Sequence, residues 1–203
     1  MPHDDHAPIE DQGYGADEFL EVAIRELLIE KNVLTAEQVN RQIDNMDSRN
    51  PALGARVIAR AWCDSTFRER LIADPLGSIE AEFDIPMAGL LELVVLENTP
   101  QVHNVVVCTL CSCYPRMLLG IPPAWYKATS YRSRVVREPR AVLSEFGLEL
   151  SKSVEVRVSD STADLRYLVL PMQPPGTDGW SEEQLAETVS RDCMIGTALP
   201  RVA

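Results

Sequence analysis

Apolar residues in the first part of the chain recur every three or four positions, which is the spacing of one face of a helix. Beginning near Asp17, this face consists of Leu20, Ile24, Leu27 and Leu28. The pattern predicts an amphipathic helix here and a mostly helical chain as far as residue 85.

Four further helices are predicted in the same region. Thr35 and Gln38 have the spacing of a capping box, so a helix is expected to begin there and to end before Asn50-Pro51. The others are expected over residues 53–63, 65–73 and 76–83. Residues 1–16 are rich in Asp, Pro, Gly and His, and they are interpreted as a mobile arm.

After Pro86 the pattern changes to short aliphatic and β-branched runs, which predict buried strands. Strands are expected over residues 93–96, 105–107, 154–158 and 165–170. Helices are expected over 125–134, 140–146 and 185–189, with a loop over 171–179. The chain is therefore predicted to be α+β, with a helical part over 17–85 and a layered α/β part over 86–203.

Composition and charge narrow the possible functions. With 203 residues, the chain can form one main domain with an extension. Its net charge of −12 disfavours nucleic acid as a partner, because affinity for phosphate backbones comes from excess Lys and Arg. No apolar run approaches the roughly 20 residues that cross a membrane, and no signal peptide is recognised, so we expect a cytoplasmic protein.

Three of the five cysteines, Cys108, Cys111 and Cys113, lie within six consecutive residues directly after a predicted strand. Thiolates at this spacing can converge on one metal ion, and soft sulfur ligands suit zinc, copper(I) or iron-type ions. A structural zinc site normally needs four protein ligands, and the chain has no second cysteine pair nearby. A disulfide would leave the third cysteine unexplained. The pattern favours a metal site, with a zinc-stabilised interaction module as the non-enzymatic alternative.

The segment Val-Cys-Thr-Leu-Cys-Ser-Cys-Tyr-Pro at 107–115 resembles the metal motif of cobalt-type nitrile hydratase α subunits. The likeness continues through residues 119–127, 131–140, 176–180 and 194–196, and covers most of 17–200. It implies the α+β fold of that family and a partner β subunit, or separate β and further small subunits, contacted by the helical part. It also implies a nitrile substrate that is hydrated to the amide.

The resemblance also implies a ligand set for one ion. The sulfur atoms of Cys108, Cys111 and Cys113 and the backbone nitrogens of Ser112 and Cys113 would bind it, with one position left open. In the family, threonine at the position of Thr109 accompanies Co³⁺ rather than iron. Cys111 would become a sulfinic acid and Cys113 a sulfenic acid, whose oxygen would attack the nitrile or activate water. Arginines that touch these oxidised cysteines would come from the β subunit.

The chain departs from the nitrile hydratase pattern at several positions. Arg116 replaces the usual tryptophan, residues 89–92 read Gly-Leu-Leu-Glu, and 191–193 read Arg-Asp-Cys. The first and last features look more like the γ subunit of thiocyanate hydrolase, so thiocyanate is the alternative substrate. We place nitrile hydration first, because nitrile hydratases are the larger group. Thr109, Tyr114 and Arg116 are expected beside the metal or in the pocket, whereas Trp125 and Tyr126 fit either the pocket or the core.

Overall fold

The computed structural model describes residues 16–85, 87, 92–111 and 113–202. It divides between Ser48 and Arg49 into two compact units. The predicted mobile arm lies outside the described residues, apart from Ala16, which begins the first helix. The helical part predicted over 17–85 spans both units, because the helices beyond Ser48 share a unit with the strands.

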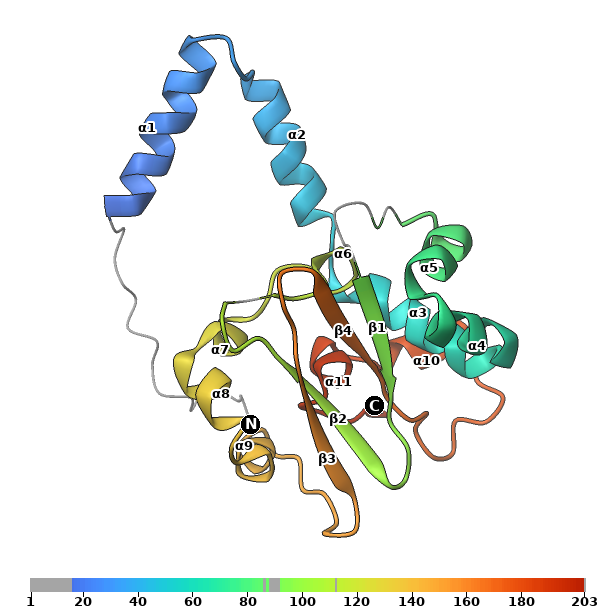
Figure 1. Cartoon of the computed structure of the whole chain (residues 1–203). Helices are drawn as coiled ribbons and strands as arrows, with labels where there is room; N and C mark the ends of the chain where they lie inside the picture. Colours follow the sequence, from blue (N-terminus) through green and yellow to red (C-terminus); the bar gives the residue numbers. More distant parts are fainter. Residues whose placement is uncertain (1–15, 86, 88–91, 112, 203) are drawn as a thin grey trace. The chain divides into compact units, whose positions relative to one another are not determined.

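The first unit consists of α1 (Ala16–Glu30) and α2 (Ala36–Asp47) (Figure 1). The predicted capping box of α2 is confirmed: the Gln38 amide donates to Thr35 Oγ1 over 3.1 Å, and the Thr35 amide donates to Gln38 Oε1 over 2.8 Å. The predicted apolar face of α1 is exposed, with Leu20 at 57% and Ile24 at 48%. Helix α2 buries no residue.

Three helices open the second unit: α3 (Pro51–Cys63), α4 (Ser65–Ala73) and α5 (Pro75–Phe83). Each begins where a polar side chain accepts hydrogen bonds from the free amides of its first turn, and these caps are Asn50, Asp64 and Asp74. Helix α3 buries Val57 and Ile58 completely, and it packs against α10 (Glu182–Glu187). The polar caps fix where these three helices begin, and their apolar faces fix which side of each helix is buried.

The strands form two parallel pairs. β1 (Glu92–Glu97) pairs with β4 (Leu165–Leu170), and β2 (Val102–Val107) pairs with β3 (Glu155–Asp160). All four were predicted, although β1, β2 and β3 differ from the predicted bounds by one to three residues. The register aligns Val107 with Asp160, so the ends of β2 and β3 lie together.

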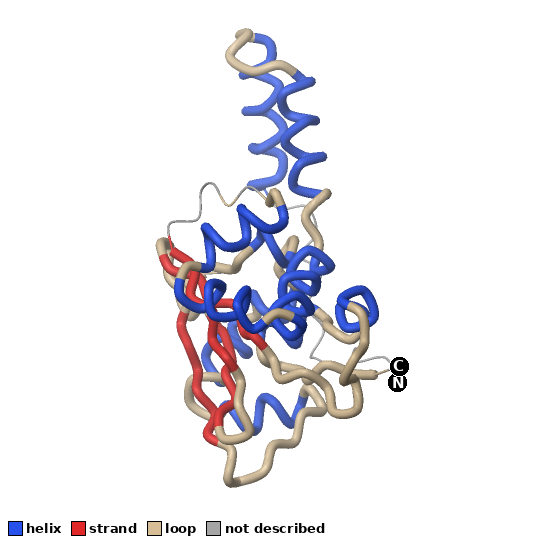
Figure 2. Tube along the Cα trace, turned by 90° about the vertical axis from the view of Figure 1, so that its right-hand side faces the viewer, coloured by secondary structure: helices blue, strands red, loops and turns tan. Residues whose placement is uncertain are grey.

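Helices flank both strand pairs (Figures 1 and 2). Helices α4 and α5 contact β1, and α11 (Arg191–Ile195) contacts β2 and β4. On the side of β2 and β3 lie α7 (Ala124–Lys127), α8 (Thr129–Arg134) and α9 (Pro139–Glu145). The buried core is mainly aliphatic with some aromatic rings, and Val105, Val106 and Val107 of β2 are almost completely buried in it.

One predicted helix is divided into two in the structure. The single helix expected over 125–134 is two short helices, α7 and α8, because Ala128 adopts an extended conformation with ψ 133°. Two short helices, α6 (Arg116–Leu119) and α11, were not predicted. Helices this short have little intrinsic stability, so tertiary packing decides where they form.

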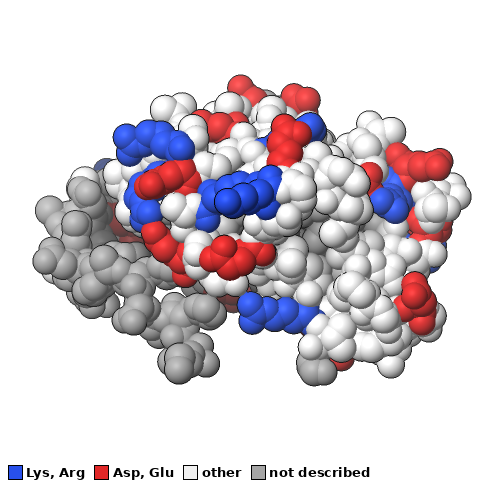
Figure 3. All heavy atoms as spheres, turned by 90° about the horizontal axis from the view of Figure 1, so that it is seen from below, with Lys and Arg blue, Asp and Glu red and all other residues white. Residues whose placement is uncertain are grey.

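Among the described helices, none is both long and apolar enough to cross a bilayer. On the face shown in Figure 3, basic side chains are interspersed with acidic ones rather than gathered into one basic surface. Charged side chains of the described residues also form ion pairs, such as those of Arg134 with Glu138 and Glu145.

Candidate metal centre

The three clustered cysteines converge at the end of β2, and we call Cys108, Cys111 and Cys113 the claw. The fully buried Val107 ends the strand, and the equally buried Cys108 begins the loop. Cys113 is half-buried and Cys111 is exposed, and none of the three cysteines forms a disulfide. Their sulfur atoms all lie within 4.8 Å of one another.

The sulfur spacing fits a single ion. The Sγ atoms of Cys108 and Cys111 are 3.5 Å apart, and those of Cys111 and Cys113 are 3.1 Å apart. With metal–sulfur bonds of about 2.3 Å, neighbouring sulfurs lie about 3.3 Å apart at right angles around an ion and about 3.8 Å apart in a tetrahedron. The distance between Cys111 and Cys113 is closer to the right-angled value, whereas the distance between Cys108 and Cys111 lies midway between the two. Thiolates are the donors that soft or borderline metals prefer.

A fourth side-chain ligand is missing from this group among the described residues, since no His, Asp or Glu there joins the three cysteines. Cys63 ends α3 and Cys193 is buried in α11, where its sulfur contacts Ser190. This argues against a tetrahedral structural zinc site, which normally uses four protein ligands.

The His103 ring uses both of its nitrogens in hydrogen bonds away from the claw. It is only 3% exposed. Its Nε2 lies 2.7 Å from the Gly196 carbonyl oxygen, and Asn98 Nδ2 lies 3.2 Å from its Nδ1. A carbonyl can only accept, so Nε2 carries the proton, and burial lowers the pKa of the ring. His103 is therefore a neutral structural residue that joins β2 to the end of α11.

Thr109 is fixed from the neighbouring strand. The Asp160 carboxylate at the end of β3 accepts from the Thr109 amide over 2.9 Å and from its hydroxyl over 2.5 Å. The parallel register that places Val107 opposite Asp160 makes this contact possible. Thr109 thus anchors the first turn of the loop through its backbone and side chain together.

The far end of the loop is fixed by an aromatic cluster. The completely buried Tyr126 donates from its hydroxyl to the Cys113 carbonyl oxygen over 2.9 Å. Its ring packs edge-on to that of Tyr114, with centroids 5.2 Å apart, and Tyr114 donates to the Leu119 carbonyl. Burial raises the pKa of both tyrosines well above the usual range, so both remain protonated donors at neutral pH. Tyr126 therefore belongs to the core and also supports the claw.

Burial and the neighbouring Cys111 thiol raise the pKa of the Cys113 thiol to about 12. The positive charge of Arg166 partly opposes this shift. In the metal-free chain this thiol is therefore protonated at neutral pH. A metal that binds it must displace the proton, and thiol ligands generally release protons when they bind metal.

Most of the basic residues that follow the claw are used elsewhere. Arg134 forms ion pairs with two glutamates, and Arg140 donates to the Leu150 and Ser151 carbonyls. Arg132 differs, because it reaches the claw loop itself. Arg116, in α6, is exposed and has no ion-pair partner among the described residues.

The structure thus brings together Cys108, Cys111, Cys113, Thr109 and Tyr114 at one end of β2 and β3. Ser112 and positions 89–91 lie outside the described residues. Asp160 was not predicted to lie at the site. Arg132 belongs to a run of basic residues after Tyr114, and no single member of that run was assigned to the claw from the sequence.

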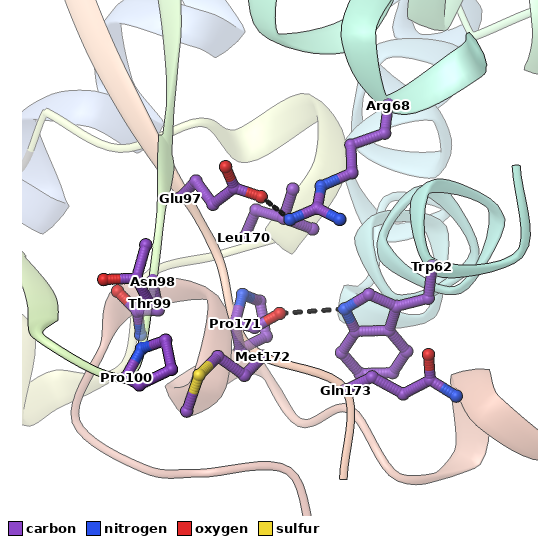
Figure 4. Close-up of a pocket in the computed structure, with 10 residues that line it drawn as sticks. All are labelled: Trp62, Arg68, Glu97, Asn98, Thr99, Pro100, Leu170, Pro171, Met172 and Gln173. Atoms are coloured by element: carbon purple, nitrogen blue, oxygen red, sulfur yellow. Dashed lines mark hydrogen bonds and ion pairs between the residues drawn. The ribbon is translucent and has the colours of Figure 1, made fainter. Parts of the chain in front are cut away.

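A separate pocket of about 240 Å³ lies at the carboxyl ends of β1 and β4 (Figure 4). Its polar groups are already paired: Arg68 contacts Glu97, and the Trp62 ring N–H donates to the Pro171 carbonyl over 2.8 Å. The pocket includes the turn that precedes β2, whereas the claw follows β2. Six strand residues span about 20 Å, so this pocket is remote from the claw.

The chain is similar to known proteins over most of its length. The family described as nitrile hydratase, alpha chain, matches residues 16–198. A nitrile hydratase subunit alpha from Rhodococcus sp is 51% identical over 178 residues, covering 86% of this chain and 88% of that protein. Thiocyanate hydrolase subunit gamma from Thiobacillus thioparus is 45% identical, covering 91% and 80%. A cobalt-containing nitrile hydratase subunit alpha from Pseudonocardia thermophila is 48% identical, covering 86% of each.

Solved structures show the same similarity. A recombinant thiocyanate hydrolase with partially modified cobalt centers superposes with a TM-score of 0.86 at 43% identity, covering 93% of this chain and 92% of that one. A double mutant of an iron-type nitrile hydratase from Comamonas testosteroni gives a TM-score of 0.86 at 39% identity, with the same coverage. This chain therefore belongs to the nitrile hydratase alpha chain family of enzymes.

Proposed function

We propose that this chain is the metal-carrying catalytic subunit of a cobalt nitrile hydratase, which adds water to a nitrile to give the amide. The observation that carries the proposal is the convergence of three cysteine thiols at the end of β2. Relatives of both the nitrile hydratase and the thiocyanate hydrolase type support a metal enzyme, and the relatives include cobalt-containing and iron-type proteins. Thr109 is the basis for choosing cobalt.

In this proposal the sulfur atoms of Cys108, Cys111 and Cys113 and the backbone nitrogens of Ser112 and Cys113 hold one cobalt(III) ion. When bound, the ion supplies Lewis acidity that makes a nitrile carbon electrophilic. Cys111 is carried as the sulfinic acid and Cys113 as the sulfenic acid, whose oxygen attacks the nitrile or activates water. Dioxygen would be the oxidant, and the selectivity for these positions follows from their thiolate character at a metal.

The chain's own residues hold the backbone of the claw loop in place. Tyr126 holds the carbonyl of Cys113 from the core side, and Asp160 holds Thr109 at the start of the loop. Because each contact fixes backbone rather than sulfur, the thiols stay available to the ion. Such supporting contacts orient ligands in metal sites generally.

We propose that the site is completed by a β subunit, or by separate β and further small subunits, in a cytoplasmic hetero-oligomer. Two exposed features support a partner. The apolar side chain of Leu110, within the claw loop, is 84% exposed beside the exposed Cys111. Helix α1 exposes Leu20 and Ile24. Exposed apolar groups of this kind mark interaction surfaces.

Thiocyanate hydrolysis to carbonyl sulfide and ammonia is the second candidate, and Arg116 favours it. Arg116 begins α6, three residues after Cys113, and is exposed without an ion-pair partner among the described residues. A free positive charge near the claw would attract an anionic substrate. Nitriles are neutral and gain nothing from it.

The test is a side-by-side assay of the cobalt-loaded complex, with its partner subunits, on nitriles and on thiocyanate. Amide formation without carbonyl sulfide would establish the nitrile hydratase. Carbonyl sulfide without amide would establish the alternative. Arg116→Trp introduces the residue that nitrile hydratases usually carry, and Arg116→Lys is the charge-matched control. If the charge attracts the anion, Arg116→Trp should raise the KM for thiocyanate, whereas Arg116→Lys should keep a KM close to that of the wild type.

A further inference from the structure

Arg132 reaches the claw loop from α8. Its Nη1 donates to the carbonyl oxygens of Cys111, over 3.3 Å, and Thr109, over 3.5 Å. Its Nη2 lies 3.5 Å from Thr129 Oγ1 in the same helix. One planar guanidinium therefore bridges two carbonyls that flank Leu110, the exposed tip of the loop.

The charge of Arg132 has no counterion among the described residues, where none of the ion pairs includes it. Its buried Nε also finds no hydrogen-bond acceptor within that part of the chain. Burying an unpaired charge is unfavourable, so a group that is negative when the site is loaded would stabilise the half-buried Arg132. Arg166 is also half-buried without an ion pair among the described residues, and it acts electrostatically on Cys113, but its hydrogen bonds go to backbone carbonyls outside the claw loop. By contrast, Arg134, in the same helix as Arg132, pairs with two glutamates.

The claw is a candidate for the missing negative charge. Three thiols lie in the loop that Arg132 contacts, and they become anionic when they bind a metal. Asp160 fixes the amide and hydroxyl of Thr109. Thr109 is thus held from two elements, its N–H by β3 and its carbonyl by α8.

We propose that Arg132 is a positioning residue for the claw. Arg132 holds the Thr109 and Cys111 carbonyls so that the thiols share one metal, and it places a positive charge of this chain beside the thiols. The inference rests on the proposed metal-binding function. It concerns the free chain as well as the assembled enzyme, because every contact involved lies within this chain.

The test is anaerobic titration of the reduced, metal-free full chain with Co²⁺, following thiolate-to-cobalt absorption in competition with a chelator. Arg132→Gln is compared with Arg140→Gln, a matched control, because Arg140 also donates to backbone carbonyls but far from the claw. We expect Arg132→Gln to bind Co²⁺ about 10- to 100-fold more weakly, the usual effect of losing a group that supports metal ligands. Arg140→Gln should bind like the wild type.

Wild-type affinity and absorption in Arg132→Gln would overturn the proposal, as would equal weakening in Arg140→Gln. If Arg132→Gln does not fold, Arg132→Met is measured instead. It keeps an aliphatic stem but removes the charge and both hydrogen bonds to the loop carbonyls, so wild-type affinity in that variant would overturn the proposal. Failure of the wild type to show thiolate-to-cobalt absorption would count against the proposed metal centre itself, which separates the two failures.

Discussion

Removing one hydroxyl group from Tyr126 should weaken both the fold and the metal site. Tyr126 is completely buried, and its hydroxyl donates to the Cys113 carbonyl over 2.9 Å. Tyr126→Phe keeps the ring and its edge-on packing against Tyr114 and Trp125, with centroids 5.2 and 5.9 Å away. The substitution therefore removes mainly the donor and leaves a carbonyl of the claw unpaired.

Leaving a buried acceptor unpaired costs about 1–3 kcal/mol. For a protein of this size, each kcal/mol lowers Tm by about 2–4 °C, so the variant should melt about 2–12 °C below the wild type. Because the freed carbonyl belongs to a metal ligand, we also expect about tenfold weaker Co²⁺ binding. Thermal unfolding and anaerobic Co²⁺ titration measure the two effects separately.

Tyr131→Phe is the matched control. Tyr131 is also buried, and its hydroxyl donates over 2.8 Å to a backbone carbonyl, that of Val106 in β2. It should lose similar stability and keep its Co²⁺ affinity. An unchanged Tm in Tyr126→Phe would refute the hydrogen-bond argument, and equal loss of affinity in both variants would refute the specific support of the claw.

Three further outcomes are expected. Burial holds the pKa of His103 below the ordinary 6.5, so below that pH the unfolded chain binds more protons than the folded chain. The free energy of unfolding should therefore fall as pH drops below about 6.5. Urea titrations at several pH values should show a weaker pH dependence in His103→Gln. Gly196 has φ +91°, and an added Cβ would collide with the Asn104 carbonyl oxygen. Gly196→Ala should therefore lower the free energy of unfolding by about 3 kcal/mol or more, against about 1 kcal/mol for Gly179→Ala, where a Cβ meets open space. Comparable losses in the two variants would contradict this reasoning. Cys63→Ser should keep full Co²⁺ stoichiometry by metal analysis, because Cys63 is exposed at the end of α3 and outside the claw.

Local patterns predicted much of the fold because they act over a few residues. The capping pair Thr35 and Gln38 forms the expected contacts, and the strand over 165–170 has the expected bounds. Prediction failed at Ala128, where one expected helix is two. There, burial of Tyr126 against the claw loop and the aromatic cluster overrides the local helical preference.

The sequence by itself determined the identity and spacing of the three thiols, since Cys108, Cys111 and Cys113 follow a strand within six residues. Only the tertiary structure decided what supports them. Asp160 and Arg132 lie far along the chain from the cysteines and reach the loop because β3 pairs in parallel with β2 and α8 lies beside that pair. Such contacts depend on strand register and helix placement, which no short segment of sequence encodes.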